Sequence, residues 1–141
     1  MPELDSLIEW FENLTPASLG QLSEFYAAEA QFKDPFNEVQ GVAAIRNIFN
    51  HMFTQVADPR FVIGSRFSGA DGTMLRWDFH FRTRGPLSKK AIVVRGVSHL
   101  RFDSSGKVTW HRDYWDASEE LYAKLPLLGC LMRSLQRIGR A

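Results

Sequence analysis

His111 and Asp113 are separated by one residue near the end of a long run of strand-forming residues. Because side chains alternate between the two faces of a strand, both point to the same side, and Trp115 follows them there. An imidazole beside a carboxylate can take up and return a proton, and an aromatic neighbour can form the wall of a pocket. The spacing therefore predicts an acid–base pair in an apolar cavity, or a structural hydrogen bond between two buried polar groups.

A hairpin must position this pair. The sequence predicts two strands, Ile92–Phe102 and Lys107–Trp115, joined by an Asp-Ser-Ser-Gly turn. On the first strand, Ser98 and Leu100 share a face that suits a core or a pocket. Ser98 has two interpretations, a small packing residue or a hydroxyl that donates to a ligand.

Asp34 is a second candidate acid or base because of its place in the chain. A short strand predicted over Ala30–Lys33 ends at Asp34-Pro35, and proline disfavours helix at the residue before it. The carboxylate therefore lies at a corner of the chain. Asp-Pro is a common turn dipeptide, so Asp34 either caps a turn or faces a cavity and exchanges protons with a ligand.

Apolar periodicity predicts the remaining elements. Helices are expected over Pro2–Asn13, from Thr15 to Ala27, from Gly41 to Asp58-Pro59, over Ala117–Tyr122 and over Leu127–Ile138. Further strands are expected over Arg60–Phe67 and Thr73–Thr83. In the latter, Trp77 and Phe79 alternate with polar residues, so they belong to the core or to a pocket wall. Helices followed by long antiparallel strands predict an α+β fold, with the helices over one face of a curved sheet.

The composition argues against several classes of partner. The chain has 141 residues, with 17 Lys and Arg against 16 Asp and Glu, and its net charge of +1 gives no overall field for nucleic acid or membrane. Neither a signal-peptide pattern nor a membrane-spanning apolar run is present, and the single Cys130 fits a reducing compartment. We therefore expect a cytoplasmic protein that binds neither nucleic acid nor membrane.

No metal or cofactor is expected either. The four histidines lack the paired spacing of zinc ligands, and Ser68–Thr73 lacks the lysine and following helix of a phosphate-binding loop. The last helix has an apolar stripe, Leu128, Leu131, Leu135 and Ile138, with arginines on its other side. Those arginines form a solvated face or, alternatively, part of a membrane-surface helix.

Several short motifs occur in a characteristic order: Tyr26-Ala27-Ala28-Glu29-Ala30, Lys33-Asp34-Pro35-Phe36, Gly41 with Ala44-Ile45, Leu100-Arg101-Phe102-Asp103 with Gly106-Lys107-Val108, and Tyr114-Trp115. With this order the chain resembles the nuclear transport factor 2-like superfamily, and within it the ketosteroid isomerases and the SnoaL-like polyketide cyclases. The resemblance implies a cone-shaped roll of N-terminal helices on a strongly curved, mainly antiparallel sheet. It also implies a homodimer. Residues 1–116 would form the cone and 117–141 a helical extension of the same domain.

The resemblance to the isomerases assigns roles to individual positions. Asp34 matches their general base, and Tyr26 matches a supporting tyrosine. Their two oxyanion donors fall on Trp10 and Ser98, and a third tyrosine falls on Phe49. Since losing one oxyanion donor can cost roughly 2.7–4 kcal/mol of transition-state stabilisation, these changes argue against steroid isomerase activity.

The SnoaL-like cyclases are similar in pairing the corner carboxylate with polar groups on the last strand, where His111 and Asp113 stand. The resemblance then implies proton transfer on a small hydrophobic, cyclic carbonyl ligand by an isomerase, cyclase or lyase, with Asp34 as the base. The pocket wall would include the side chains expected to face the sheet interior, Trp10, Tyr26, Phe49, Trp77, Phe79, Leu100 and Trp115. The alternative is a non-catalytic ligand-binding or dimerisation module, since one fold hosts many functions.

Overall fold

The computed structural model describes residues 2–84, 90–124 and 126–140; residues 85–89, between the strands predicted over Thr73–Thr83 and Ile92–Phe102, lie outside this range. The helical segments that precede the long strands are α1 (Pro2–Glu12), η1 (Ala17–Gln21), α2 (Leu22–Phe25) and α3 (Val42–Gln55). Those that follow the sheet are α4 (Ala117–Glu120), η2 (Tyr122–Lys124) and α5 (Pro126–Gly139).

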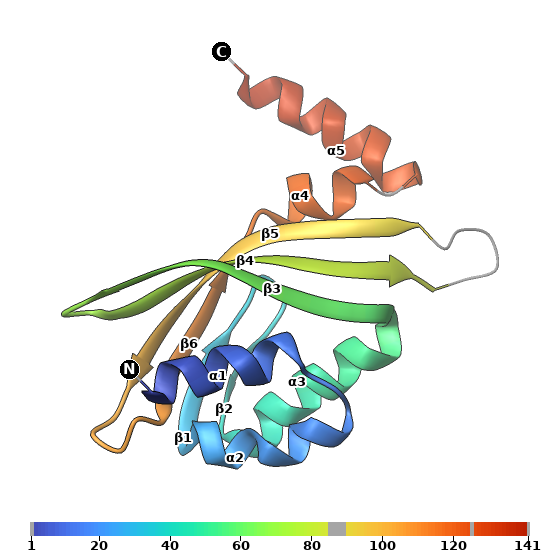
Figure 1. Ribbon diagram of the computed structural model, residues 1–141. Helices are drawn as coiled ribbons and strands as arrows, with labels where there is room; N and C mark the ends of the chain where they lie inside the picture. The colour runs from blue at the N-terminus through green and yellow to red at the C-terminus, as the bar shows by residue number, and fades with distance from the viewer. Residues whose placement is uncertain (1, 85–89, 125, 141) are drawn as a thin grey trace.

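Six strands form one curved, unclosed sheet (Figure 1). They are β1 (Tyr26–Lys33), β2 (Glu38–Gln40), β3 (Val56–Gly69), β4 (Gly72–Thr83), β5 (Ala91–Phe102) and β6 (Val108–Tyr114). Their order in the sheet is β2-β1-β6-β5-β4-β3. Only the β1–β6 pair is parallel among the pairs of this sheet. The predicted α+β fold is therefore confirmed.

The helices α1, α2 and α3 lie along one face of the sheet and enclose the main core (Figure 1). Apolar residues at helical spacing point inward, so Leu7, Leu22 and Ile45 are each at most 1% exposed. Full burial of one such side chain contributes about 1.5–3 kcal/mol. A second, smaller cluster of buried residues consists of Trp77 and Phe81 on β4 and of Ile92 and Val94 on β5.

Several boundaries differ from the predicted ones. The helix expected to run to Asp58-Pro59 ends at Gln55, and Asp58-Pro59 lies within β3, which begins at Val56 rather than at Arg60. The helix expected to reach Ala27 ends at Phe25, because from Tyr26 onward the chain pairs in parallel with β6. This pairing sets Phe32 beside His111. The short β2, which was not predicted, is stabilised by antiparallel pairing to β1, although its own residues are mostly exposed.

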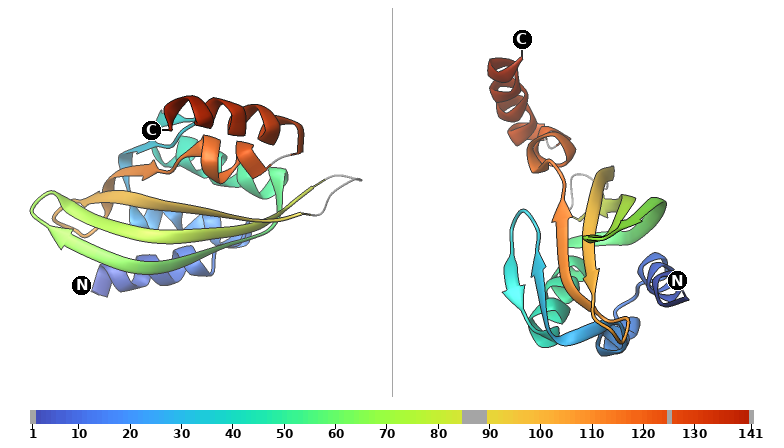
Figure 2. Two further views of the ribbon diagram at one scale, coloured as in Figure 1. Left: turned by 90° about the horizontal axis from the view of Figure 1, so that it is seen from above. Right: turned by 90° about the vertical axis from the view of Figure 1, so that its left-hand side faces the viewer.

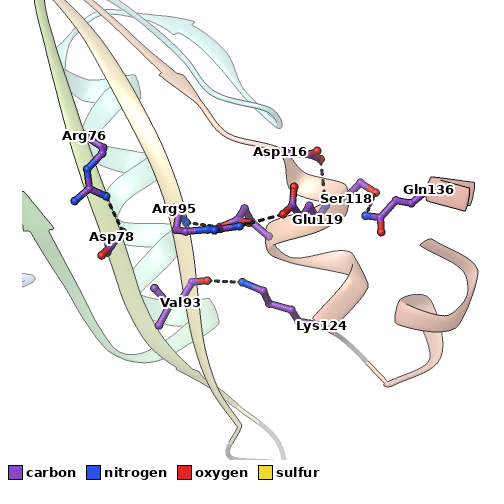
Figure 3. Close-up of polar contacts among 10 residues, drawn as sticks. Arg76, Asp78, Val93, Arg95, Asp116, Ser118, Glu119, Lys124 and Gln136 are labelled. Atoms are coloured by element: carbon purple, nitrogen blue, oxygen red, sulfur yellow. Dashed lines mark hydrogen bonds and ion pairs between the residues drawn. The ribbon is translucent and has the colours of Figure 1, made fainter. Parts of the chain in front are cut away.

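The C-terminal segment continues beyond the end of β6, next to β5 (Figure 1). Figure 3 shows the contacts that attach it to β5: the guanidinium and backbone N–H of Arg95 donate to the buried Glu120 carboxylate at 2.7–2.8 Å. The Lys124 ammonium donates to the Val93 carbonyl at 2.6 Å. Beyond these contacts α5 projects away from the rest of the chain (Figure 2).

Candidate acid–base site

An apolar cavity of about 330 Å³ lies between α3 and the concave face of the sheet. Most of its lining is aromatic or aliphatic, from Phe32, Phe36, Ile48, Phe49, Met52, Val56, Phe61, Trp77, Phe79, Phe81, Val94, Trp115 and Leu121. The polar lining residues are Asp34, Asn37, His51, Gln55 and Asp113. Asp113 also lines a small inner hollow of about 30 Å³ and an open depression on the rim of the sheet. Asp113 therefore lies where the three hollows adjoin.

The His111–Asp113 pair predicted from the strand alternation is present. His111 Nε2 lies 2.7 Å from Asp113 Oδ1, and His111 Nδ1 lies 2.6 Å from the Tyr26 hydroxyl oxygen. The imidazole is only 3% exposed and packs against the rings of Phe11, Tyr26 and Phe32. Such enclosure keeps the ring in one orientation, so both nitrogens meet fixed partners.

Ser98 reaches the same carboxylate from the neighbouring strand. Register pairs Ser98 with Asp113 across β5 and β6, and the hydroxyl donates to Asp113 Oδ1 at 2.5 Å. The Trp77 indole N–H donates to Ser98 Oγ at 2.9 Å. Because an indole N–H only donates, the single Ser98 proton must point to the carboxylate.

The directions of these hydrogen bonds define the protonation pattern of the network. With the Ser98 proton pointing at Oδ1, Asp113 accepts there as a carboxylate, and His111 donates from Nε2. Burial, and secondarily the negative charge of Asp113, raise the pKa of Tyr26 well above its usual value of 10.0. Tyr26 therefore keeps its proton, and its hydroxyl pairs with His111 Nδ1 while Nε2 faces Asp113.

The structure places Asp34 on the same cavity, but in a different bonding environment. Its Oδ1 accepts from the backbone N–H groups of Phe36 at 2.8 Å and Asn37 at 2.7 Å, and from the Asn37 side chain at 3.1 Å. Oδ2 accepts from Asn37 Nδ2 at 3.2 Å. Asp34 thus caps the turn after β1, as one of its two interpretations expected.

Three other site candidates, Trp10, Leu100 and Tyr26, lie away from this cavity. Trp10 packs in the core between Phe11, Phe25 and Phe49, and its indole N–H donates to the Ser18 carbonyl at 3.0 Å. Leu100 is fully buried in the main core. Tyr26 contacts His111 rather than the cavity, whereas Phe49, Trp77, Phe79 and Trp115 line it.

Sequence reasoning missed several wall residues. Phe61 and Val94 alternate inward on β3 and β5, so strand periodicity could have identified them. Phe36, which lies between Trp115 and Tyr122, comes from a turn, and Leu121 comes from the C-terminal segment. No periodic signal marks those two positions.

Neither a metal cluster nor a membrane-spanning helix occurs in the part of the chain that the structure describes. No three His, Cys, Asp or Glu side chains converge there in an arrangement that could hold an ion. None of the helices formed by residues 2–84, 90–124 and 126–140 is both long and apolar enough to cross a bilayer.

A helix-covered, strongly curved sheet around an apolar cavity with a carboxylate and a histidine in its wall is a cone of the α+β class. The chain belongs to the family of SnoaL-like domains, whose model matches residues 7–111. The match ends at His111, so Asp113 and the C-terminal segment lie beyond it. A search of curated proteins gives no match.

The solved structures that share this fold include the following three proteins. A hypothetical protein from Catenulispora acidiphila with a ketosteroid isomerase-like fold, solved with trimethylamine, has a TM-score of 0.72 and 17% identity over 88% of this chain and 93% of its own. An NTF2-like protein of unknown function from Exiguobacterium sp. 255-15 has a TM-score of 0.69 and 17% identity over 81% and 98%. The epoxide hydrolase/cyclase-like enzyme SalBIII, which has a role in pyran ring formation in salinomycin, has a TM-score of 0.69 and 18% identity over 82% and 91%. At these identities the likeness shows the fold alone.

Proposed function

We propose that the cavity binds a small hydrophobic carbonyl compound, cyclic in shape, and that Asp113 removes a proton from the carbon beside the carbonyl. One observation carries this proposal: two donors hold Asp113 Oδ1, while Oδ2 accepts from no described residue. Every fully buried side-chain oxygen of the described residues has a partner. Oδ2 is therefore accessible, and it belongs to a residue that lines the apolar cavity.

The proton transfer proceeds in two steps. Asp113 Oδ2 takes the proton, and the electron pair of the broken C–H bond moves into the carbonyl group to give an enolate. In a ligand whose enolate is conjugated with a C=C bond, return of the proton to a different carbon makes the reaction an isomerisation. In a ligand with a second carbonyl group, attack of the enolate carbon on that carbonyl carbon makes it a cyclisation, in which the C=O π pair moves to oxygen and the alkoxide takes the proton from Asp113 Oδ2. His51, which lines the same cavity, would donate a ring N–H to the enolate oxygen.

His111 and Asp34 have separate roles in this proposal. His111, held by Tyr26, supports the carboxylate through Nε2 while the proton resides on Oδ2. Asp34 stands at the cavity wall as a second carboxylate, whose bonds to Phe36 and Asn37 shape the entrance. SalBIII, a cyclase-like enzyme of the same fold, supports a ring-forming or isomerising reaction class.

Deuterium exchange tests the proposal. 2-Tetralone, a bicyclic ketone with acidic protons beside its carbonyl, is incubated with the protein in D₂O and followed by NMR. The wild type should exchange these protons faster than buffer alone, and Asp113→Asn should lower kcat/KM about a hundredfold, the usual contribution of a general base. Asp34→Asn is the matched carboxylate control and should lower it less than tenfold. Loss of exchange in Asp34→Asn with retention in Asp113→Asn would transfer the role of base to Asp34.

A non-catalytic ligand-binding or dimerisation module is the second candidate, and the bonding of Asp34 favours it. Both oxygens of that carboxylate have partners within its own turn, so the residue that matches the isomerase base is used structurally. Wild-type protein that binds 2-tetralone without accelerating its exchange would establish this candidate. Mass spectrometry of small molecules that co-purify with the protein would then identify the ligand class.

Two further properties belong to the proposal. We place the protein in the cytoplasm, because its single Cys130 suits a reducing compartment. We also propose a homodimer, supported by the large apolar side chains that one protomer leaves exposed on α5, namely Leu131, Leu135 and Ile138.

A further inference from the structure

The Asp113 carboxylate receives its two hydrogen bonds from two different strands. His111 approaches along β6 itself, and Ser98 approaches from β5, directly opposite Asp113 in the register. Both donors meet Oδ1. Two donors on one oxygen fix the plane of the carboxylate, so Oδ2 keeps one direction relative to the cavity.

The hydrogen bond from Ser98 to Asp113 depends on Trp77. A serine hydroxyl can rotate and donate to any acceptor within reach. Here the indole N–H of Trp77 occupies an acceptor lone pair of Ser98 Oγ at 2.9 Å. Both side chains are only 5% exposed, so solvent offers the Ser98 proton little competition. The proton therefore stays directed at Asp113.

Gly96 makes room for the indole. Register places Trp77 opposite Gly96, and Ser98 lies opposite Leu75, so the indole reaches Ser98 along the diagonal between strands β4 and β5. A Cβ at position 96 would lie 2.3 Å from Trp77 Cη2, well inside van der Waals contact. Only glycine leaves the indole where its N–H meets Ser98.

We infer that Ser98 and Trp77 are positioning residues for the proton transfer proposed above, on which this inference rests. They hold Asp113 with Oδ1 occupied and Oδ2 directed at the ligand. Trp77 also lines the cavity, so one face of the ring contacts the ligand while its N–H orients the base through Ser98. From its sequence position, Ser98 was expected to donate a hydrogen bond to a ligand. In the structure it donates to Asp113 instead, so we assign Ser98 the role of orienting that carboxylate.

The test uses the 2-tetralone exchange assay with Ser98→Ala, Ser98→Thr and Trp77→Phe. Ser98→Ala and Trp77→Phe should each lower kcat about tenfold or more. In both variants the Asp113 carboxylate is no longer held at the distance and angle to the ligand that proton removal requires. KM should change less than threefold in Ser98→Ala, which keeps the cavity wall. Ser98→Thr keeps the hydroxyl and should recover most of kcat. Ser65→Ala and Trp110→Phe, at positions outside the cavity, are the matched controls.

A double-mutant cycle separates positioning from a general loss of structure. In the Asp113→Asn background, Ser98→Ala should cause no further loss beyond about twofold, because its effect acts through Asp113. An equal loss in both backgrounds would overturn the positioning role. Loss in Ser98→Ala that Ser98→Thr does not recover would overturn it as well.

NMR of the His111 ring separates this inference from the proposed function. ¹⁵N shifts should show an imidazole protonated at Nε2, and the Nε2–H proton resonance should move in both Ser98→Ala and Trp77→Phe. An unmoved resonance in both variants overturns the inference even where Asp113→Asn abolishes exchange. A moved resonance without exchange activity in the wild type leaves the hydrogen-bond arrangement intact but overturns the proposed function, and with it the role of Ser98 and Trp77 in proton transfer.

Discussion

At the scale of single residues, two carboxylates line one cavity and differ in what their oxygens do. Asp34 places both oxygens within its own turn, whereas Asp113 has one oxygen held and one accessible. A base needs an available lone pair beside the substrate proton. The hydrogen bonds of the two carboxylates therefore favour Asp113 as the base over Asp34, the residue that matches the isomerase base in the sequence.

The Tyr26 hydroxyl should contribute measurably to stability. Tyr26→Phe removes the donor to His111 Nδ1 and leaves that nitrogen buried without a partner, which should cost about 1–3 kcal/mol of unfolding free energy. Urea denaturation measures the change. Tyr114→Phe, at an exposed position, is the control and should stay within about 0.5 kcal/mol of the wild type. Equal stability of Tyr26→Phe and the wild type would show that the bond is not formed in solution.

At the scale of elements, the ion pair between β5 and the C-terminal segment should make stability depend on acid pH. Hydrogen bonds from Arg95, opposed by burial, lower the pKa of Glu120 from 4.5 to about 2. The folded state thus favours the charged carboxylate, so its contribution is complete above pH 4.5 and is lost as the pH falls toward 2.

The comparison of wild type with Glu120→Gln isolates this effect. At pH 7 the variant should be less stable by about 1.5–3 kcal/mol, the range for a hydrogen bond to a charged group. The difference should shrink as the pH falls through the window from 4.5 to about 2. Urea titrations at several pH values measure it, with Glu24→Gln, at an exposed position, as the control. A difference that does not change with pH would contradict the assigned role of Glu120.

Local patterns predicted the long elements well because each repeats over many residues. Strand alternation placed His111 beside Asp113, and the 3.6-residue period located α1 and α3. The start of β1 at Tyr26 could not be predicted in this way, since it depends on parallel pairing with a strand about 80 residues later. Tertiary pairing overrides a local helical pattern in such cases.

The site was less predictable than the fold because its contacts join distant strands. Alternation shows that Ser98 and Asp113 face inward, but only the hairpin register makes them partners. The position of Trp10 depends on the Ser18 carbonyl, which belongs to η1. Its assignment as a cavity donor rested on family resemblance, and the local backbone uses its N–H instead.

At the scale of the whole molecule, α5 contacts the rest of the chain through its polar side. Gln136 donates to Ser118 at 3.2 Å and Arg133 donates to the Ala123 carbonyl at 2.7 Å, while Ile138 on the other side is 81% exposed. The side chain of Leu128, part of the predicted stripe, lies outside what the structure describes. A surface helix usually buries its apolar side, so this arrangement supports a second protomer as the partner.

Light scattering after size-exclusion chromatography tests the proposed homodimer. The wild type should have twice the mass of one 16.1 kDa chain. Replacing Leu131 and Leu135 together by Gln should shift the mass toward that of the monomer, because it removes the exposed apolar surface. Arg137→Gln, on the polar side, is the control. A wild-type monomer at every concentration would contradict the dimer, and an unchanged dimer in the double variant would move the interface away from α5.

The central claim is that Asp113 presents a free oxygen to a ligand in the apolar cavity. A crystal structure with 2-tetralone bound tests it most directly. The account predicts that the carbon beside the carbonyl lies roughly 3–3.5 Å from Asp113 Oδ2, with Ser98 and His111 still bonded to Oδ1. A ketone bound elsewhere, or a side chain bonded to Oδ2 in the ligand-filled cavity, would contradict it.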